Sequence, residues 1–200
     1  MRIIGGKSKG RKLKEVHRTA TRPTMDRVRE SLFAILAPWI EGARFLDLFA
    51  GTGSVGLEAL SRGGKEVVFV DINRACASVI RENADLLGRS ADAQVIPRRW
   101  ESAIHQLAAE GQCFDIVFAD PPYEQEGVLK KVAEQILGLG LIAPGGWIIF
   151  EHSVRLQSPA IWPGNPQTDA RRFGDTMLTL LRIADSEAAP HLHHRFPREL

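Results

Sequence analysis

The chain has 200 residues with a net charge of +2; 44% of its residues are hydrophobic and 25% are charged. This composition is typical of a globular protein with one substantial core, and we expect a single domain over residues 1–185. There is no apolar run long enough to cross a bilayer and no hydrophobic stretch after the first charges, so we expect a cytoplasmic protein. Cys76 and Cys113 each lack a neighbouring cysteine or a histidine at ligand spacing, which predicts free thiols and no metal site.

Positive charge is concentrated in the first part of the chain. Residues 1–31 contain ten Lys or Arg and three acidic residues, a balance of +7, whereas the rest contains 16 basic and 21 acidic residues, a balance of −5. The segments RIIGG and RKLKEV flank KSKG, which predicts a short hairpin with a basic tip. Such a segment suggests a polyanion partner, most simply nucleic acid, although a solvated basic terminus explains the charge alone equally well.

A helix is predicted after the Arg-Pro pair at residues 22–23. Thr24 can serve as its N-cap, and Pro38 and Gly42 close the segment. Apolar residues recur between them at helical spacing, namely Val28, Leu32, Ile35, Leu36 and Trp39. Arg27 and Arg29 lie in the first turns, against the helix dipole, which hints at an anionic ligand nearby. The hairpin and this helix make up a predicted N-terminal part, residues 1–42.

From residue 43 onward the chain alternates between two patterns. Short, nearly all-apolar segments predict strands at residues 44–50, 66–71, 93–97, 114–119 and 146–151, and helical patterns occupy 54–62, 73–87, 101–109 and 127–137. Buried strands separated by helices favour a parallel sheet covered on both faces. DARRF and TMLTLLRI flank a Gly-Asp turn and predict a closing antiparallel hairpin. The expected fold is therefore a doubly wound, mostly parallel, seven-stranded α/β sheet over residues 43–185, followed by a disordered tail, residues 186–200.

Three of the turns that follow strands carry unusual residues, and ligands of such sheets bind at the carboxyl ends of strands. Gly51, Gly53 and Gly56 form G-x-G-x-x-G between a strand and a helix, which lets the backbone approach a ligand closely. Asp47, inside that strand, would repel a pyrophosphate but could pair with the ammonium group of an amino acid moiety; alternatively, it caps the turn. Asp71 ends the next strand and can accept both hydroxyls of a ribose, or it only leads into the next helix.

The third unusual turn reads DPPY, from Asp120 to Tyr123. The Asp120 carboxylate and the Pro121 carbonyl can accept the two N–H groups of an exocyclic amine on a nucleobase. Pro122 stiffens the turn and Tyr123 can stack on the ring. The alternative is a Pro-rich turn in which the acid caps and the tyrosine covers the core. Its coincidence with the first two turns favours the functional interpretation.

Together these segments resemble a known family of enzymes. RIIGGKSKGRKL, RPTMDRVRESLF, LDLFAGTGSVGLEALSRGG and DPPYEQ, in that order, are similar to the RsmD-like bacterial methyltransferases that modify guanine N2 in small-subunit ribosomal RNA. The resemblance covers about residues 2–182. It implies a Rossmann-like class I methyltransferase fold, S-adenosyl-L-methionine as the cofactor and ribosomal RNA as the partner, either free or within a small-subunit assembly intermediate.

The resemblance also implies roles for individual residues. The methionine end of the cofactor is assigned to Asp47, Phe49, Gly51 and Gly53, the ribose to Asp71, the adenine to Ile72, and closure over the cofactor to Arg22 and Thr24. Asp120, Pro121, Pro122 and Tyr123 form the catalytic loop. Where such enzymes place an acidic or amide residue for the adenine amine, this chain reads RRWE, so Glu101, a backbone carbonyl or stacking by Trp100 takes that role. The RNA contacts expected from the basic segment are Arg2, Lys7, Lys9, Arg11, Lys12 and Arg27.

Functions of other classes remain open at this point. An NAD-dependent oxidoreductase would explain the glycines and Asp71 but leaves DPPY without a purpose. A non-catalytic RNA-binding assembly factor would explain the basic segment but not the cluster of acceptors. Among methyltransferases, DNA adenine, DNA cytosine and protein glutamine are rival substrates, and the ten basic residues argue against a protein.

Overall fold

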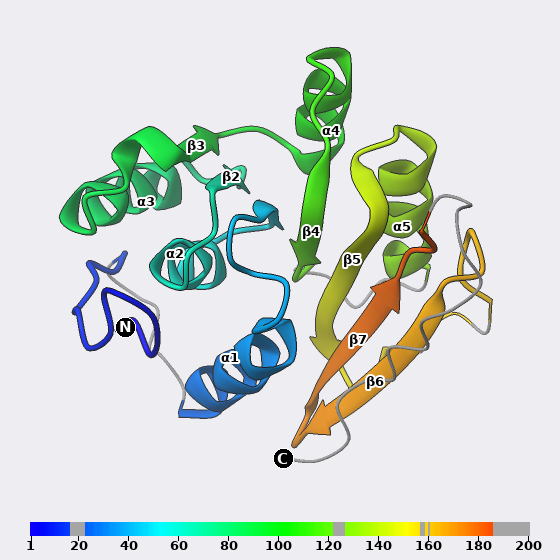
Figure 1. Ribbon diagram of the computed structural model, residues 1–200, viewed down its shortest axis with the longest axis horizontal. Coiled ribbons are helices and arrows are strands. Elements are labelled where there is room, and N and C mark those ends of the chain that lie inside the picture. The colour runs from blue at the N-terminus through cyan, green and yellow to red at the C-terminus, as the bar shows by residue number, and fades with distance from the viewer. Residues whose placement is uncertain (17–22, 122–126, 157–158, 160, 186–200) are drawn as a thin grey trace.

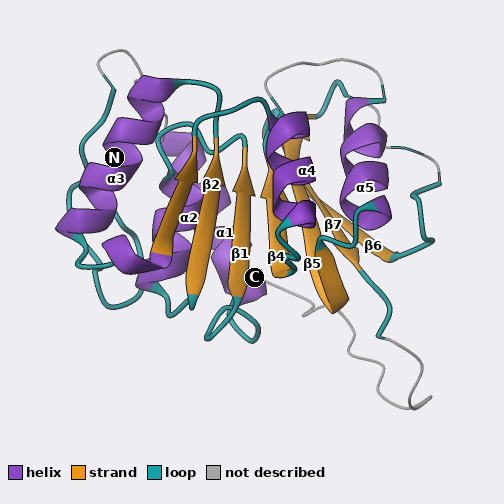
Figure 2. Cartoon of the chain, turned by 90° about the horizontal axis from the view of Figure 1, so that it is seen from above, coloured by secondary structure: helices purple, strands orange, loops and turns teal. Residues whose placement is uncertain are grey.

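A computed structural model describes residues 1–16, 23–121, 127–156, 159 and 161–185. One sheet of seven strands runs through it, with helices packed on both faces (Figures 1 and 2). The strands are β1 (Arg44–Leu48), β2 (Glu66–Val70), β3 (Ala93–Ile96), β4 (Phe114–Ala119), β5 (Ile142–Ser153), β6 (Gln167–Phe173) and β7 (Thr176–Arg182). The helices are α1 (Pro23–Leu36), α2 (Ser54–Ser61), α3 (Arg74–Leu86), α4 (Trp100–Ala109) and α5 (Val128–Gly138), with a short 3₁₀ turn at Ser90–Asp92.

The strand order is β3-β2-β1-β4-β5-β7-β6, and β1 to β5 pair in parallel. Strand β7 is antiparallel to both β5 and β6, as the pattern around the Gly-Asp turn predicts. The predicted fold class is therefore confirmed. After β1, the chain adds β2 and β3 on one side and later places β4 on the other. The order thus reverses between β1 and β4, and ligands of open α/β sheets bind at such a point.

Residues along each strand point alternately to two apolar cores, one on each face of the sheet. Phe45, Phe118 and Ile149 face the core that α1, α2 and α3 cover. Leu46 and Leu48 face the core that α4 and α5 cover. The central strands β1 and β4 are buried on both faces, which is why their sequences are nearly continuous apolar runs.

The basic segment folds back on itself as predicted, but only one isolated bridge, between Arg2 and Lys12, pairs its arms. Backbone hydrogen bonds from Ile3 N to Arg11 O (3.0 Å) and from Gly10 N to Ile3 O (2.9 Å) close the hairpin. Ile3 and Leu13 insert into the core beside α2. The hairpin is therefore part of the folded body.

Helix α1 begins at Pro23 and ends at Leu36. The prediction that Thr24 caps it is wrong, because Thr24 lies within the first turn. Proline is favoured at the first helical position, where its missing N–H leaves no hydrogen bond unmade. Trp39 lies beyond the helix, since the residue before Pro38 is disfavoured in helical conformation. The predicted tail at 186–200 lies outside the described residues, and in the described part of the chain each helix is too short or too polar to cross a membrane.

Candidate active site

A cleft of about 760 Å³ lies at the carboxyl ends of β1, β2 and β4, a volume that suits a nucleotide-sized ligand. Seven of the predicted site residues line it: Phe49, Gly51, Asp71, Ile72, Glu101, Asp120 and Pro121. The rest of the lining is Val70, Arg98, Arg99, Trp100, Gly127, Val128 and Lys131. The structure thus brings the three predicted turns together. Arg22, Pro122 and Tyr123 lie outside the described residues, and Thr24 is described only through its backbone.

The first turn holds a strained backbone. Phe49 has φ of 72°, a left-handed conformation that costs a bulky residue energy and is concentrated at functional sites. Hydrogen bonds from Phe49 N and Ala50 N to Val70 O, at 3.0 and 2.9 Å, fasten the turn to the end of β2. Gly51, with φ of 54°, faces the cleft with open space where a side chain would lie. Gly53 packs toward Ile80 and opens α2, so it shapes the turn from behind.

Asp47 lies beneath this turn rather than on the cleft wall. Its side chain is 1% exposed, and its Oδ2 accepts a hydrogen bond from Gly56 N at 2.9 Å, in the first turn of α2. Burial raises the pKa of Asp47 to about 7; the Gly56 N–H opposes this shift, and the charges of Asp120 and Asp71 add to it. The structure therefore contains the capping contact, while the pairing of Asp47 with a cofactor ammonium group stays a prediction.

Asp71 joins the first two turns. One carboxylate oxygen accepts from Gly51 N at 2.8 Å and the other from Asn73 N at 2.7 Å. Because each oxygen can accept a second hydrogen bond, Asp71 retains capacity for two ribose hydroxyls at the cleft. Asn73 caps α3 by accepting from Ala75 N at 2.9 Å. Ile72 is 66% exposed beside it and presents an apolar surface to the cleft.

The first turn of α4 supplies an acid with an unused oxygen. Glu101 Oε1 lies 3.5 Å from Arg99 Nη2 and 3.7 Å from Lys131 Nζ. Glu101 Oε2 is buried and has no hydrogen-bond partner within the described chain. Burial works against ionisation, but the backbone N–H of Glu101 and the charges of Arg99 and Lys131 together lower its pKa. An ionised carboxylate with a buried, unpaired oxygen is an acceptor that a nucleobase amine fits.

Trp100 stands between this acid and the glycine turn. Its ring lies 5.9 Å from that of Phe49, tilted by 50°, and Lys131 Nζ lies 5.3 Å from its centre. These contacts fix the indole in the cleft wall. Of the alternatives that the RRWE sequence leaves open, the geometry favours Glu101 as the acceptor and Trp100 as part of the wall.

The described half of the DPPY turn supplies acceptors at the end of β4. Asp120 is open to the cleft on one side, yet the surrounding protein removes enough water to raise its pKa to about 6. Pro121 follows it and is buried. A carboxylate with this pKa is mostly ionised at neutral pH and can still take up a proton when one is released.

Glu151, near the end of β5, is a candidate site residue that the sequence reasoning missed. Burial raises its pKa to about 7; the charge of Asp120 contributes, Arg29 opposes the shift, and Asp47 adds to it. The signal was present in the sequence, because the strand GWIIFE ends in an acid, as the strand before Asp71 does. No glycine or proline follows Glu151, so that turn did not stand out.

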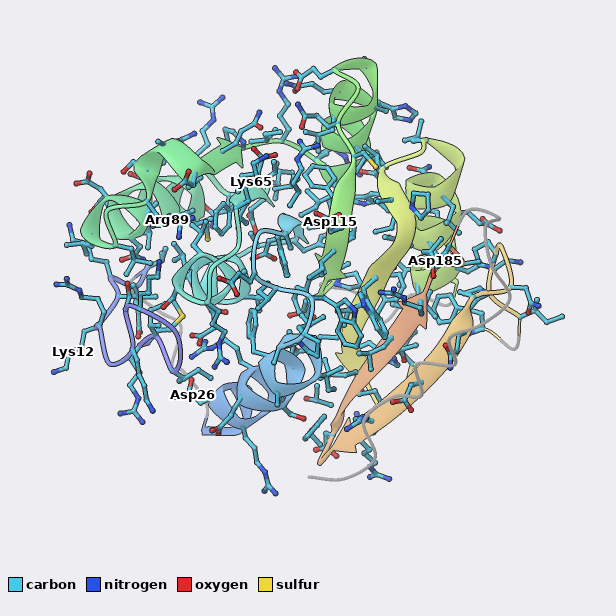
Figure 3. All side chains as sticks on the ribbon, viewed as in Figure 1. Lys12, Asp26, Lys65, Arg89, Asp115 and Asp185 are labelled. Atoms are coloured by element: carbon cyan, nitrogen blue, oxygen red, sulfur yellow. The ribbon has the colours of Figure 1, made fainter. Side chains whose placement is uncertain are left out.

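The six predicted RNA-binding side chains are all exposed, and Lys12 projects outward from the hairpin (Figure 3). The tip is held by Lys7 N donating to Ser61 O at 2.7 Å and Ser8 N to Ser61 Oγ at 3.0 Å. Ser61 ends α2, whose first residue follows the glycine turn. Since an eight-residue helix is about 12 Å long, the tip lies about that far from the cleft, at the opposite edge of the sheet.

Arg29 does not present its charge to a ligand, contrary to what its place against the helix dipole suggested. Its side chain is 5% exposed, and Nη2 donates to Arg2 O and Asp26 Oδ1, both at 2.9 Å. Its Nε lies 3.9 Å from Glu58 Oε2. Arg29 therefore ties α1 to the hairpin and to α2.

Because the pKa values of Asp47 and Glu151 are raised from 3.8 and 4.5 to about 7, we expect the unliganded protein to lose stability as pH rises. The folded state keeps protons that the unfolded state releases. The stability from these groups is therefore complete below about pH 4 and lost as pH rises through about 7.

Urea unfolding at pH 5 and pH 7.5 measures the change, and Asp47→Asn combined with Glu151→Gln should reduce it. A control, Glu134→Gln on the exposed face of α5, should leave it unchanged; an unaltered pH dependence in the double variant would contradict the prediction.

The topology, the glycine turn and the acceptors beyond β4 define the class of Rossmann-like, S-adenosylmethionine-dependent methyltransferases. The sequence profile of the family described as "Conserved hypothetical protein 95" matches residues 1–182, and the chain belongs to this family.

Individual proteins agree with this assignment. Ribosomal RNA small subunit methyltransferase D of Escherichia coli (strain K12) is 38% identical over 158 residues, which cover 79% of this chain and 74% of that protein. The structure of the Escherichia coli protein yhhF superposes with a TM-score of 0.80 at 33% identity, covering 93% of this chain and 99% of that one. The Thermus thermophilus 16S rRNA N2 G1207 methyltransferase RsmC, solved with AdoMet and guanosine, shares the fold, with a TM-score of 0.66 at 20% identity over 84% of this chain and 44% of that one.

Proposed function

We propose that this protein transfers the methyl group of S-adenosyl-L-methionine to the exocyclic N2 amine of a guanine in small-subunit ribosomal RNA. The observation that carries the proposal is the pair of acceptors, Asp120 and the Pro121 carbonyl, at a cleft whose other wall offers Asp71 and Glu101 to an adenosine. The family and the 38% identity to an enzyme named as a small-subunit methyltransferase support it. Residues 1–185 would act as one methyltransferase domain, in the cytoplasm, where ribosomal subunits are assembled.

The residues present fit this cofactor. Glu101 Oε2, buried and unpaired among the described residues, would accept the adenine amine, and Asp71 would accept the ribose hydroxyls. Ile72 would lie against the adenine ring. The glycine turn, with Asp47 beneath it, would receive the methionine end. When bound, S-adenosylmethionine supplies a methyl group on a positively charged sulfonium, which is electrophilic without further activation.

The chain's own groups then have to align and activate the guanine amine. This amine is conjugated with its ring and is a poor nucleophile. Hydrogen bonds to Asp120 and to the Pro121 carbonyl would hold its two N–H groups and direct the nitrogen lone pair toward the methyl group. As positive charge develops on nitrogen, the same acceptors bind it more strongly than they bind the ground state. With a pKa of about 6, Asp120 can also accept the proton that the methylated amine releases.

Methyl transfer from labelled cofactor to small-subunit ribosomal RNA that lacks the modification tests the proposal. We expect one labelled nucleoside, N2-methylguanosine, which mass spectrometry of the digested RNA identifies and places in the sequence. Free RNA and assembly intermediates, compared as substrates, show which form the enzyme accepts. Binding of NAD in place of S-adenosylhomocysteine would support an oxidoreductase, and RNA binding without transfer would support an assembly factor; either result would contradict the proposal.

Charge reversal at the hairpin tip, with Lys7, Lys9 and Arg11 changed to Glu, should weaken RNA binding and leave the affinity for S-adenosylhomocysteine intact. The tip lies at the opposite edge of the sheet from the cleft, so its charges act on RNA phosphates only. Each lost phosphate contact lowers the slope of log K against log salt by about 0.7 to 0.9, so the loss of three contacts lowers it by about 2 to 3. The slope is measured by titrating RNA at several salt concentrations.

A matched control for the hairpin is Arg172→Glu on β6, at the other end of the sheet. It alters the net charge without touching the hairpin and should keep the salt slope of the unaltered protein. An unchanged slope in the hairpin variant would remove the tip from the RNA-binding surface.

A further inference from the structure

We propose that Glu151 selects guanine as the substrate base by accepting a hydrogen bond from its N1–H, next to the amine that Asp120 and the Pro121 carbonyl hold. This inference rests on the proposed function and adds a specificity-determining residue to it. Its basis is the position of Glu151 in the sheet, its lack of a partner, and the pattern of donors on guanine.

The sheet register places Glu151 beside Asp120. Strands β4 and β5 are parallel neighbours, with Phe118 opposite Ile149 and Ala119 opposite Phe150. Asp120 follows Ala119 directly, and Glu151 follows Phe150 directly. Since neighbouring strands lie about 4.8 Å apart, the two acids emerge side by side at the carboxyl edge of the sheet.

Alternation along β5 fixes the face to which Glu151 points. Ile149 packs into the core with α1, α2 and α3, and Phe150 packs into the opposite core. Glu151, two residues after Ile149 and still within β5, therefore points to the first face. Asp47 projects from β1 to the same face, because its carboxylate reaches α2. Acids from β1, β4 and β5 thus approach one region beside the cleft.

Glu151 has no partner among the described residues that explains its position. It is half-buried, and its carboxylate makes no hydrogen bond or close ion pair within the described chain. The charged groups that act on it are Asp120 and Asp47, which repel it, and Arg29 on α1, which attracts it from a distance while its Nη2 is bound to Asp26. A partly desolvated carboxylate beside two others is unfavourable unless a donor arrives. The substrate is the natural source of that donor.

Guanine carries the matching donors. Its N1–H lies next to the N2 amine on the same edge of the ring, so two adjacent acceptors on the protein meet donors at both positions. In adenine and cytosine, the ring nitrogen next to the amine is an acceptor, and a carboxylate there would repel it. The Asp120 and Pro121 acceptors hold an exocyclic amine of any base, whereas a second carboxylate beside them distinguishes guanine.

An RNA substrate with 2-aminopurine in place of the target guanine tests this assignment, because 2-aminopurine keeps the amine but lacks the N1–H. We expect the unaltered enzyme to show a kcat/KM roughly 10- to 100-fold lower on the 2-aminopurine RNA, the usual discrimination of a good base contact. Glu151→Gln should lower kcat/KM on the guanine RNA by a smaller factor, because the neutral amide oxygen accepts the N1–H more weakly than a carboxylate does. It should not lower kcat/KM on the 2-aminopurine RNA, because the glutamine amide can donate to the unprotonated N1. The preference for guanine should therefore largely disappear.

The control measurements separate this role from a structural one. Glu151→Gln has the same shape and removes a half-buried charge, so its thermal unfolding temperature and its affinity for S-adenosylhomocysteine should be retained. Glu151→Asp keeps the charge and should keep the preference for guanine at a lower rate. Glu134→Gln on α5 should match the unaltered enzyme on both RNAs.

The possible failures are distinguishable. If the unaltered enzyme methylates the guanine RNA and Glu151→Gln keeps the same preference, the role of Glu151 is overturned and the proposed function stands. If Glu151→Gln loses affinity for S-adenosylhomocysteine in the same measure as activity, Glu151 serves the cofactor and the inference is again overturned. If the unaltered enzyme methylates neither RNA, the proposed function falls, and the inference with it.

Discussion

Asp120→Ala should lower the turnover of methyl transfer by several orders of magnitude and leave the affinity for S-adenosylhomocysteine nearly unchanged. Asp120 ends β4 at the cleft, where its carboxylate would meet the amine as positive charge develops. Removing one such group from a site where charge develops costs about 10² to 10³ in rate, and loss of the proton acceptor adds to that. The cofactor's predicted contacts lie on the turns after β1, β2 and β3, so they survive the change.

Single-turnover kinetics with labelled cofactor and calorimetric titration with S-adenosylhomocysteine check the two halves of this prediction. Asp120→Asn keeps an acceptor oxygen without the charge and should fall between alanine and the unaltered enzyme. Asp169→Asn on β6, far from the cleft, is the matched control and should have full activity. Near-normal turnover of Asp120→Ala would show that the catalytic assignment is wrong.

Gly56→Ala should destabilise the protein by about 1 to 3 kcal/mol, the usual cost of overpacking a core. A Cβ at Gly56 would lie 2.3 Å from Phe69 Cε1 and 2.8 Å from Val67 Cγ1, and both of these side chains are buried in β2. Helix α2 would have to move away from the sheet. Because Gly56 N also donates to Asp47, the glycine turn would move with the helix, and we expect weaker binding of S-adenosylhomocysteine as well.

Chemical denaturation measures the first effect and calorimetric titration the second. Gly138→Ala is the matched control, since Gly138 ends α5 with no atom within 4 Å of an added Cβ. It should keep or slightly raise stability, because alanine favours the helix by up to about 1 kcal/mol. Equal losses in the two variants would mean that close packing against Phe69 is not the cause.

Much of the fold was predictable because it is encoded locally. Strands buried on both faces appear as apolar runs, and the glycines of the first turn mark where a strand changes to a helix. The three ligand-facing turns converge because carboxyl ends of parallel strands share one edge of the sheet. The hairpin's position was not predictable, since it depends on contacts such as Ile4 N to Glu58 Oε2 at 2.9 Å, between residues 54 positions apart.

The site was predictable at the level of turns and less so at the level of side-chain contacts. The sequence places Asp47 in a strand but does not show that its carboxylate reaches Gly56. Periodicity also could not show that Arg29 is buried and donates hydrogen bonds to Asp26 and to the carbonyl of Arg2. Glu151 escaped notice because it closes an apolar strand without glycine or proline after it. These are contacts between elements, and a one-dimensional pattern does not encode them.

Strand β6, at one edge of the sheet, bears on how the molecule avoids self-association. An edge strand has unpaired backbone N–H and C=O groups on its free side, which can recruit another sheet and begin aggregation. Asp169, Arg171 and Arg172 lie in the middle of β6, and because Arg171 and Arg172 are adjacent, charge lies on both of its faces. A second strand approaching this edge would have to desolvate these charges. Replacing them with valine or threonine would leave the fold intact but create an edge strand that can pair with another sheet. These charges therefore protect the protein from aggregation through β6.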